Sequence, residues 1–89
     1  MTNWHEVLEY KEGELFWTVD LGNSVIYPGK EAGYLHGHTE WQITYNRKKY
    51  PYKQVVCEMH YGYEIDPDKI KRISSNRHDN SIENLYFEL

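Results

Sequence analysis

The stretch IKRISSNRHDNSIENL, residues 70–85, contains three successive structural signals. Its first part places isoleucines on either side of a Lys-Arg pair, a pattern that predicts a strand over 69–74. The polar run SNRHDN, 75–80, is typical of a loop. Asn80, with a glutamate three residues later, forms a capping-box pattern that predicts a short amphipathic helix over 81–88. The C-terminal part is therefore expected to be a strand–loop–helix unit.

The rest of the chain predicts an α+β fold in which antiparallel β-hairpins are joined to short helices. Strand-like alternation and turn residues recur through the first half, and Pro51 precedes a helical pattern that Gly62 closes. The expected elements are a helix over 4–10, strands over 14–19, 31–35 and 40–46, a turn over 46–49 and a helix over 52–61.

The composition predicts a single domain over residues 1–89 with an aromatic core. Three Trp, nine Tyr and two Phe supply most of the large apolar side chains. The single cysteine excludes an intramolecular disulfide and is typical of a reducing compartment. The sequence contains neither a signal-peptide pattern nor an apolar run near the ~18 residues that a spanning helix needs. We therefore expect a soluble, cytoplasmic protein with no membrane partner.

Charge is distributed unevenly along the chain. Fourteen acidic and ten basic residues give a net charge of −4, and residues 1–45 hold seven of the acids but only two lysines. Proteins that hold DNA through its phosphates normally present a basic face. The dense basic cluster here is Arg47-Lys48-Lys49, with Lys53 nearby. On charge alone, this cluster is better explained as a solvated hairpin end than as a DNA-binding surface.

Several segments, in this order, resemble the small HNH endonucleases found in bacteriophage genomes. They are EVLEYKEGELFW, EAGYL, NRKKYPY, VVCEMHYG and NRHDNSIENL. The resemblance implies a ββα-metal-like fold and a phage-encoded protein that works in the host cytoplasm. It also implies a site for phosphodiester hydrolysis, in which an Asp-His pair supplies a metal ligand and the general base and a His-Arg pair begins the central helix.

The residues at these positions depart from that chemistry. Lys71 and Arg72 stand in the Asp-His positions, and Lys53 and Gln54 stand in the His-Arg positions. An ammonium group repels a divalent cation, and a guanidinium stays protonated and cannot act as a base. We therefore expect no catalytic residue, no bound metal and no cofactor. The motif residues that remain are His60, Arg77, Asp79, Asn80 and Asn84, and structural roles are expected for them. Asn80 is expected to cap the last helix, and Asp79 to accept hydrogen bonds from loop amides. Asn84 is expected to connect this helix to the loop.

Other histidines do not assemble a convincing alternative site. His36-x-His38 and Cys57-x-x-His60 have spacings that place two ligands together, but no third ligand can be named for either pair. Cys57 is better explained as a small buried apolar residue. His78 could replace the missing base only if the loop register has shifted.

Two functions remain open. In the first, the chain is a catalytically inactive HNH-fold protein that binds a host protein, inhibiting or modulating a defence or nucleic-acid-processing enzyme through the acidic residues Glu9, Glu12, Asp20 and Glu31. In the second, it is a DNA-binding HNH-family protein, or an endonuclease with a displaced site, that contacts phosphates through Arg47, Lys48, Lys49, Lys53, Lys71, Arg72 and Arg77. Exposed tyrosines could serve either function, by stacking on bases or by anchoring a protein interface; the candidates are Tyr45, Tyr50, Tyr52, Tyr61 and Tyr63.

Overall fold

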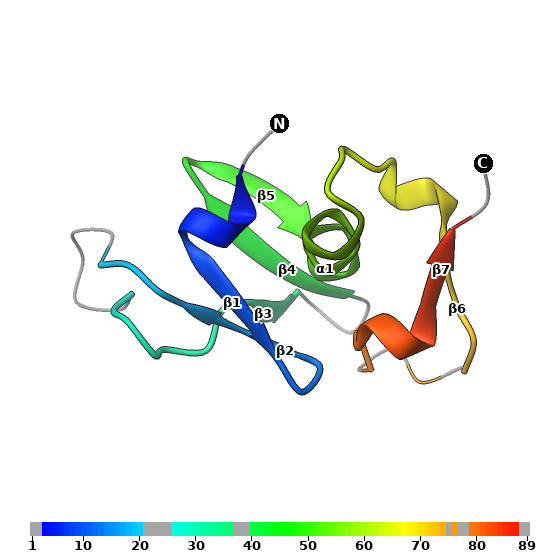
Figure 1. Cartoon of the computed structure of the whole chain (residues 1–89), viewed down its shortest axis with the longest axis horizontal. Helices are drawn as coiled ribbons and strands as arrows, with labels where there is room; N and C mark the ends of the chain where they lie inside the picture. Colours follow the sequence, from blue (N-terminus) through cyan, green and yellow to red (C-terminus); the bar gives the residue numbers. More distant parts are fainter. Residues whose placement is uncertain (1–2, 21–25, 37–39, 75, 77–78, 88–89) are drawn as a thin grey trace.

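The computed structural model of the chain describes residues 3–20, 26–36, 40–74, 76 and 79–87, which form an α+β fold. In these residues, three small antiparallel sheets surround one α-helix, α1 (Tyr52–Tyr61). The helix packs on strands β4 and β5 and also contacts the C-terminal segment on its other side (Figure 1).

The first sheet is a hairpin of β1 (Leu8–Lys11) and β2 (Glu14–Trp17), with Leu8 opposite Trp17. The predicted helix over 4–10 is wrong. Only Trp4–Glu6 forms a helical turn, the 3₁₀ element η1, and β1 begins two residues later. Apolar residues at helical spacing are a weak signal over so short a segment, and pairing with β2 satisfies the backbone groups of β1 instead.

The second sheet has the order β3-β4-β5, formed by Tyr34–His36, Glu40–Tyr45 and Lys48–Pro51. The strand predicted over 31–35 is displaced, because Glu31 makes only an isolated bridge with Phe16 and β3 begins at Tyr34. β4 and β5 are joined through Asn46 and Arg47, whose φ angles are 52° and 65°. Two consecutive left-handed residues are the geometry of a tight two-residue hairpin turn.

Helix α1 has the bounds that the sequence predicts. It begins directly after Pro51 and ends at Gly62, whose φ of 85° is left-handed and whose N–H donates to the Glu58 carbonyl (2.9 Å). Apolar side chains from this helix form the centre of the core; they are Val55, Val56, Cys57 and Met59.

The third sheet pairs β6 (Ile70–Arg72) with β7 (Leu85–Phe87), preceded by the 3₁₀ turns η2 (Pro67–Lys69) and η3 (Ile82–Asn84) respectively. The predicted helix over 81–88 is therefore wrong, since it is reduced to η3 and followed by a strand. Asn80 does not cap it, because its side chain is buried and bonded to Arg72. Leu85–Phe87 pairs with β6 instead of continuing the turn.

A buried carboxylate connects three parts of the chain. Glu58 is only 5% exposed and accepts hydrogen bonds from Trp4 Nε1 (2.8 Å) and Gln54 Nε2 (2.9 Å). It also accepts one from the Ile65 backbone N–H (3.1 Å). A charged group removed from water requires such partners, and here they fix η1 and the chain after α1 against the helix.

Tyr52 makes a second buried connection. Its hydroxyl accepts a hydrogen bond from the Leu15 N–H (2.6 Å), and burial raises its pKa to about 12. Gly33, with a φ of 91°, lies against the Tyr52 ring so closely that a Cβ atom at position 33 would stand 2.7 Å from it. Strand β2, helix α1 and the approach to β3 therefore meet at this ring.

We expect Glu58→Ala to lower the free energy of unfolding by about 3 kcal/mol, because it leaves the Trp4 and Ile65 donors buried without an acceptor. Urea denaturation measures this change. Glu64→Ala removes a nearby exposed carboxylate and serves as the control, with an expected change within about 0.5 kcal/mol. Equal effects of the two substitutions would contradict the role given to Glu58.

The thiol of Cys57 is fully buried, and burial, followed by the charge of Glu58, raises its pKa from 9.0 to about 11. The fraction of thiolate at pH 8 should therefore be about 100-fold lower in the native chain than in the unfolded chain. Alkylation by iodoacetamide at pH 8 should be slower by at least that factor than in concentrated urea.

The raised pKa of Cys57 also makes the stability of the fold depend on pH. Its contribution is fully present below pH 9 and should be lost as pH rises towards 11. Rapid alkylation of the folded chain would contradict this account.

Candidate functional site

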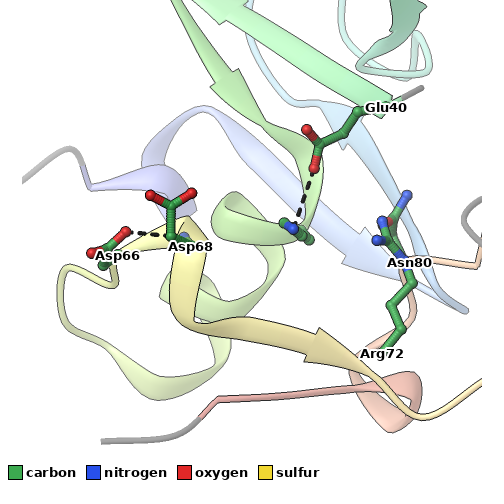
Figure 2. A network of polar contacts seen from close by, with 6 residues as sticks. Glu40, Asp66, Asp68, Arg72 and Asn80 are labelled. Carbon is green, nitrogen blue, oxygen red and sulfur yellow. Dashed lines mark hydrogen bonds and ion pairs between the residues drawn. The ribbon is translucent and has the colours of Figure 1, made fainter. Parts of the chain in front are cut away.

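Arg72, one of the two residues in the expected Asp-His positions, is held by a hydrogen bond within the protein. Its Nη2 atom donates to Asn80 Oδ1 at 2.5 Å, and Figure 2 shows the guanidinium directed at the Asn80 side chain. Asn80 is 4% exposed, and Arg72 Nε is buried without a partner among the described residues. Arg72 therefore supports the segment before η3.

Lys71 is directed away from Arg72. Consecutive strand residues point to opposite faces, so Lys71 lies on the exposed face of β6 opposite Tyr86, while Arg72 lies opposite the buried Leu85. The two cations of the expected Asp-His positions do not share a site.

Asp79 and Asn84 organise the loop before η3. Asp79 accepts hydrogen bonds from Ser81 Oγ (2.6 Å) and Ser81 N (3.1 Å). These bonds, with a further contribution from the charge of Arg72, lower the pKa of Asp79. Asn84 accepts from the Ser74 N–H (2.8 Å) and donates to the Asp79 carbonyl (3.0 Å). Both side chains are engaged in loop structure.

The residues in the expected His-Arg positions are also paired. Lys53 Nζ lies 3.4 Å from Glu40 Oε1, and the pair joins α1 to β4 (Figure 2). Gln54 donates to Glu58. His60 is exposed at the end of α1, with its ring edge-on to Tyr61 at 4.8 Å between centroids.

The described part of the chain contains no group of three or more His, Cys, Asp or Glu side chains that could hold a metal ion. Three residues considered from the sequence, His38, Arg77 and His78, lie outside the described residues. No helix in the described ranges is long and apolar enough to cross a membrane.

The basic cluster occupies the β4–β5 turn. Arg47 is exposed at the turn itself, and Lys48 and Lys49 are exposed at the start of β5. Since Lys48 and Lys49 are consecutive in the strand, they project from opposite faces. Lys48 Nζ lies 5.3 Å from the centroid of the Tyr50 ring. The cluster is therefore a charged tip rather than a basic face.

Two of the acidic residues named from the sequence come together around an aromatic side chain. Glu9 is opposite Phe16 in the β1–β2 register, and Phe16 bridges to Glu31 on its other side. Directly opposed residues share a face, so Glu9, Phe16 and Glu31 form a lateral row, called here the acidic row. Both glutamates are exposed and Phe16 is half-buried.

The remaining acidic candidates lie outside the acidic row. Glu12 lies in the β1–β2 turn and Asp20 follows β2. Phe16 was missed from the sequence, although the alternation in ELFW already indicates that it faces away from Leu15 and Trp17.

The tyrosines divide into core and surface groups. Tyr52 is buried, which excludes it from stacking on a base, and Tyr45 and Tyr50 pack against Trp4 at 5.7 and 4.8 Å. Tyr61 and Tyr63 are exposed and contact Phe87 at 4.9 and 6.2 Å.

Arg72→Met should lower the free energy of unfolding by about 1–2 kcal/mol, because Asn80 Oδ1 loses its charged donor in a buried position. Lys71→Met, one residue away on the exposed face, should change it by less than about 0.5 kcal/mol. Urea denaturation of both variants separates the two roles, and a larger loss from Lys71→Met would contradict the assignment.

Comparison of the chain with protein-family models, with curated proteins and with solved structures gave no significant match.

Proposed function

We propose that this protein is a catalytically inactive HNH-like protein, encoded by a phage, that acts by binding a host protein. The observation that carries this proposal is the acidic row: two exposed carboxylates, Glu9 and Glu31, on either side of Phe16 on one face of the β1–β2 hairpin. A half-buried aromatic flanked by charges can anchor an interface while the charges steer the approach of a basic partner.

The charged residues next to the acidic row on the hairpin leave its negative character unchanged. Further along the hairpin, Lys11 lies opposite Glu14, so these two charges offset each other. The row itself contains no basic residue. Enzymes that process nucleic acids present basic surfaces to their substrates, and an acidic surface is complementary to such surfaces. We therefore propose that the partner is a host defence or nucleic-acid-processing enzyme that this protein inhibits or modulates.

The absence of catalysis in this proposal rests on the chemistry of the expected Asp-His positions. Arg72 cannot accept a proton and is bonded to Asn80, and Lys71 projects from the other face. Asp79 and Asn84 are occupied by loop hydrogen bonds. Arg72, Asp79 and Asn84 maintain the loop, and the four residues together offer neither a base nor a set of metal ligands.

A second candidate function is nucleic-acid binding through the β4–β5 turn, favoured by the exposure of Arg47, Lys48 and Lys49. It ranks lower because the two lysines project from opposite faces of β5, and because Lys53 is neutralised by Glu40. Such a tip can contact few phosphates of one duplex at the same time.

The test uses the full chain immobilised and exposed to lysate of the bacterial host. We expect one stoichiometric partner, and we expect Glu9→Lys with Glu31→Lys to weaken its association about tenfold at low salt and less at high salt. Glu64→Lys with Glu83→Lys, which changes the net charge equally elsewhere on the surface, is the matched control.

The same preparation should not cleave plasmid DNA with Mg²⁺ or Mn²⁺. Metal-dependent cleavage would overturn the proposal. The proposal would also be overturned if no protein partner is recovered and the chain binds DNA in a salt-dependent way that the double substitution Lys48→Glu with Lys49→Glu abolishes.

A further inference from the structure

A groove of ≈ 580 Å³ runs between strand β1, helix α1 and turn η3. On the strand side it is lined by three consecutive residues, Leu8, Glu9 and Tyr10. Because consecutive side chains of a strand project from opposite faces, a groove that touches all three follows the backbone edge of β1 rather than one of its faces. On the helix side, the lining residues have the i, i+3, i+4 spacing of a single helix face; they are Val56, Met59 and His60.

The backbone groups of Leu8 and Tyr10 point away from β2. In an antiparallel pair, residues that bond each other alternate with opposed residues whose N–H and C=O groups both point outwards. Trp17, which lies opposite Leu8, is of the second kind: its N–H donates to the Lys30 carbonyl (2.8 Å), and its own carbonyl accepts from the Gly29 N–H (2.8 Å). Leu8 therefore directs its N–H and C=O to the opposite edge, and so does Tyr10, two residues further along the strand.

These outward groups of β1 have no hydrogen-bond partner among the described residues. Leu8 is only 2% exposed, so its N–H and C=O are largely removed from water, which is unfavourable until they gain partners. The edge strand β5 differs, because it contains Lys48, Lys49 and Pro51, residue types that discourage pairing at an edge. β1 contains one lysine and no proline. Its edge is therefore suited to pairing with a further strand.

We infer that the groove receives an extended segment of the partner protein, which pairs with β1 as an additional strand. Another extended backbone presents N–H and C=O groups at the spacing of those of Leu8 and Tyr10, and this is the basis of recognition by strand addition. Side chains of the added strand that face α1 meet Val56 and Met59 and should be apolar. This occupant rests on the protein-binding function proposed above and adds how the partner is held.

The test uses the synthetic peptide acetyl-Ser-Val-Thr-Val-Thr-Ser-amide, whose alternating side chains favour an extended backbone. Hydrogen exchange of individual backbone amides is followed by NMR at millimolar peptide. Exchange of the Tyr10 amide should slow at least about fivefold, because a new hydrogen bond protects it. The Glu9 and Lys11 amides face β2 and should slow less than about twofold.

Chemical-shift changes without slowed exchange at Tyr10 would indicate binding through side chains alone and would overturn the inference. It would also be overturned if the Tyr10 amide slows without peptide as the protein concentration is raised, because the groove would then belong to a second copy of the chain.

A variant pair provides the matched control. His60→Trp places a bulkier side chain at an exposed position that lines the groove, and it should weaken peptide binding at least about fivefold. Tyr63→Trp, at an exposed position outside the groove, should leave the affinity unchanged. Equal affinity of the two folded variants would contradict the inference, and if His60→Trp does not fold, the exchange experiment on the unaltered chain decides.

The peptide experiment is independent of the capture of a host protein. A captured partner together with unprotected Tyr10 would overturn only the strand addition. Peptide binding with slowed exchange at Tyr10, but without a captured partner, would overturn only the proposed function.

Discussion

The hydrogen bonds of the Glu58 carboxylate are the interaction on which the arrangement of the chain depends. A carboxylate that is 5% exposed is unfavourable unless its oxygens are bonded, and its partners come from the N-terminal turn, from α1 itself and from the segment after the helix. The apolar core supplies most of the favourable free energy, but apolar contacts are not directional. The carboxylate determines which segments meet at the helix and in what orientation.

The strength of local signals explains which elements could be predicted from the sequence. Helix α1 depends on the local signals Pro51 and Gly62 and occurs where they indicate. The turn predicted over 46–49 is shorter, because Asn46 and Arg47 alone form it and Lys48 and Lys49 already belong to β5. The segments 4–10 and 81–88 also have helical patterns. They lie at the two ends of the described chain, where pairing with a neighbouring strand competes with a short helix that has few internal hydrogen bonds. Strand pairing prevails in both, within a local hairpin for β1 and across the intervening loop for β7, and the helical pattern of these segments does not reveal it.

The candidate site was predictable to a similar extent. The adjacent cations Lys71 and Arg72 are visible in the sequence, and so is the acidic character of the first half. The hydrogen bond between Arg72 and Asn80 is not visible in the sequence, because a guanidinium beside a polar loop has many possible partners. The acidic row is also hidden, since Glu9, Phe16 and Glu31 become neighbours only through the register of three separate segments.

The contact between Gly33 and the Tyr52 ring has a consequence for recognising distant relatives. A Cβ atom at position 33 would stand 2.7 Å from the ring, while the hydroxyl of the same ring holds the Leu15 amide. Glycine at position 33 is therefore required twice, because a Cβ atom would meet the ring and because a φ of 91° is strained for any other residue. The glycine and the tyrosine are expected together in any lineage that preserves this packing. A search that weights this glycine–tyrosine pair jointly would recognise such sequences independently of the residues at 70–85.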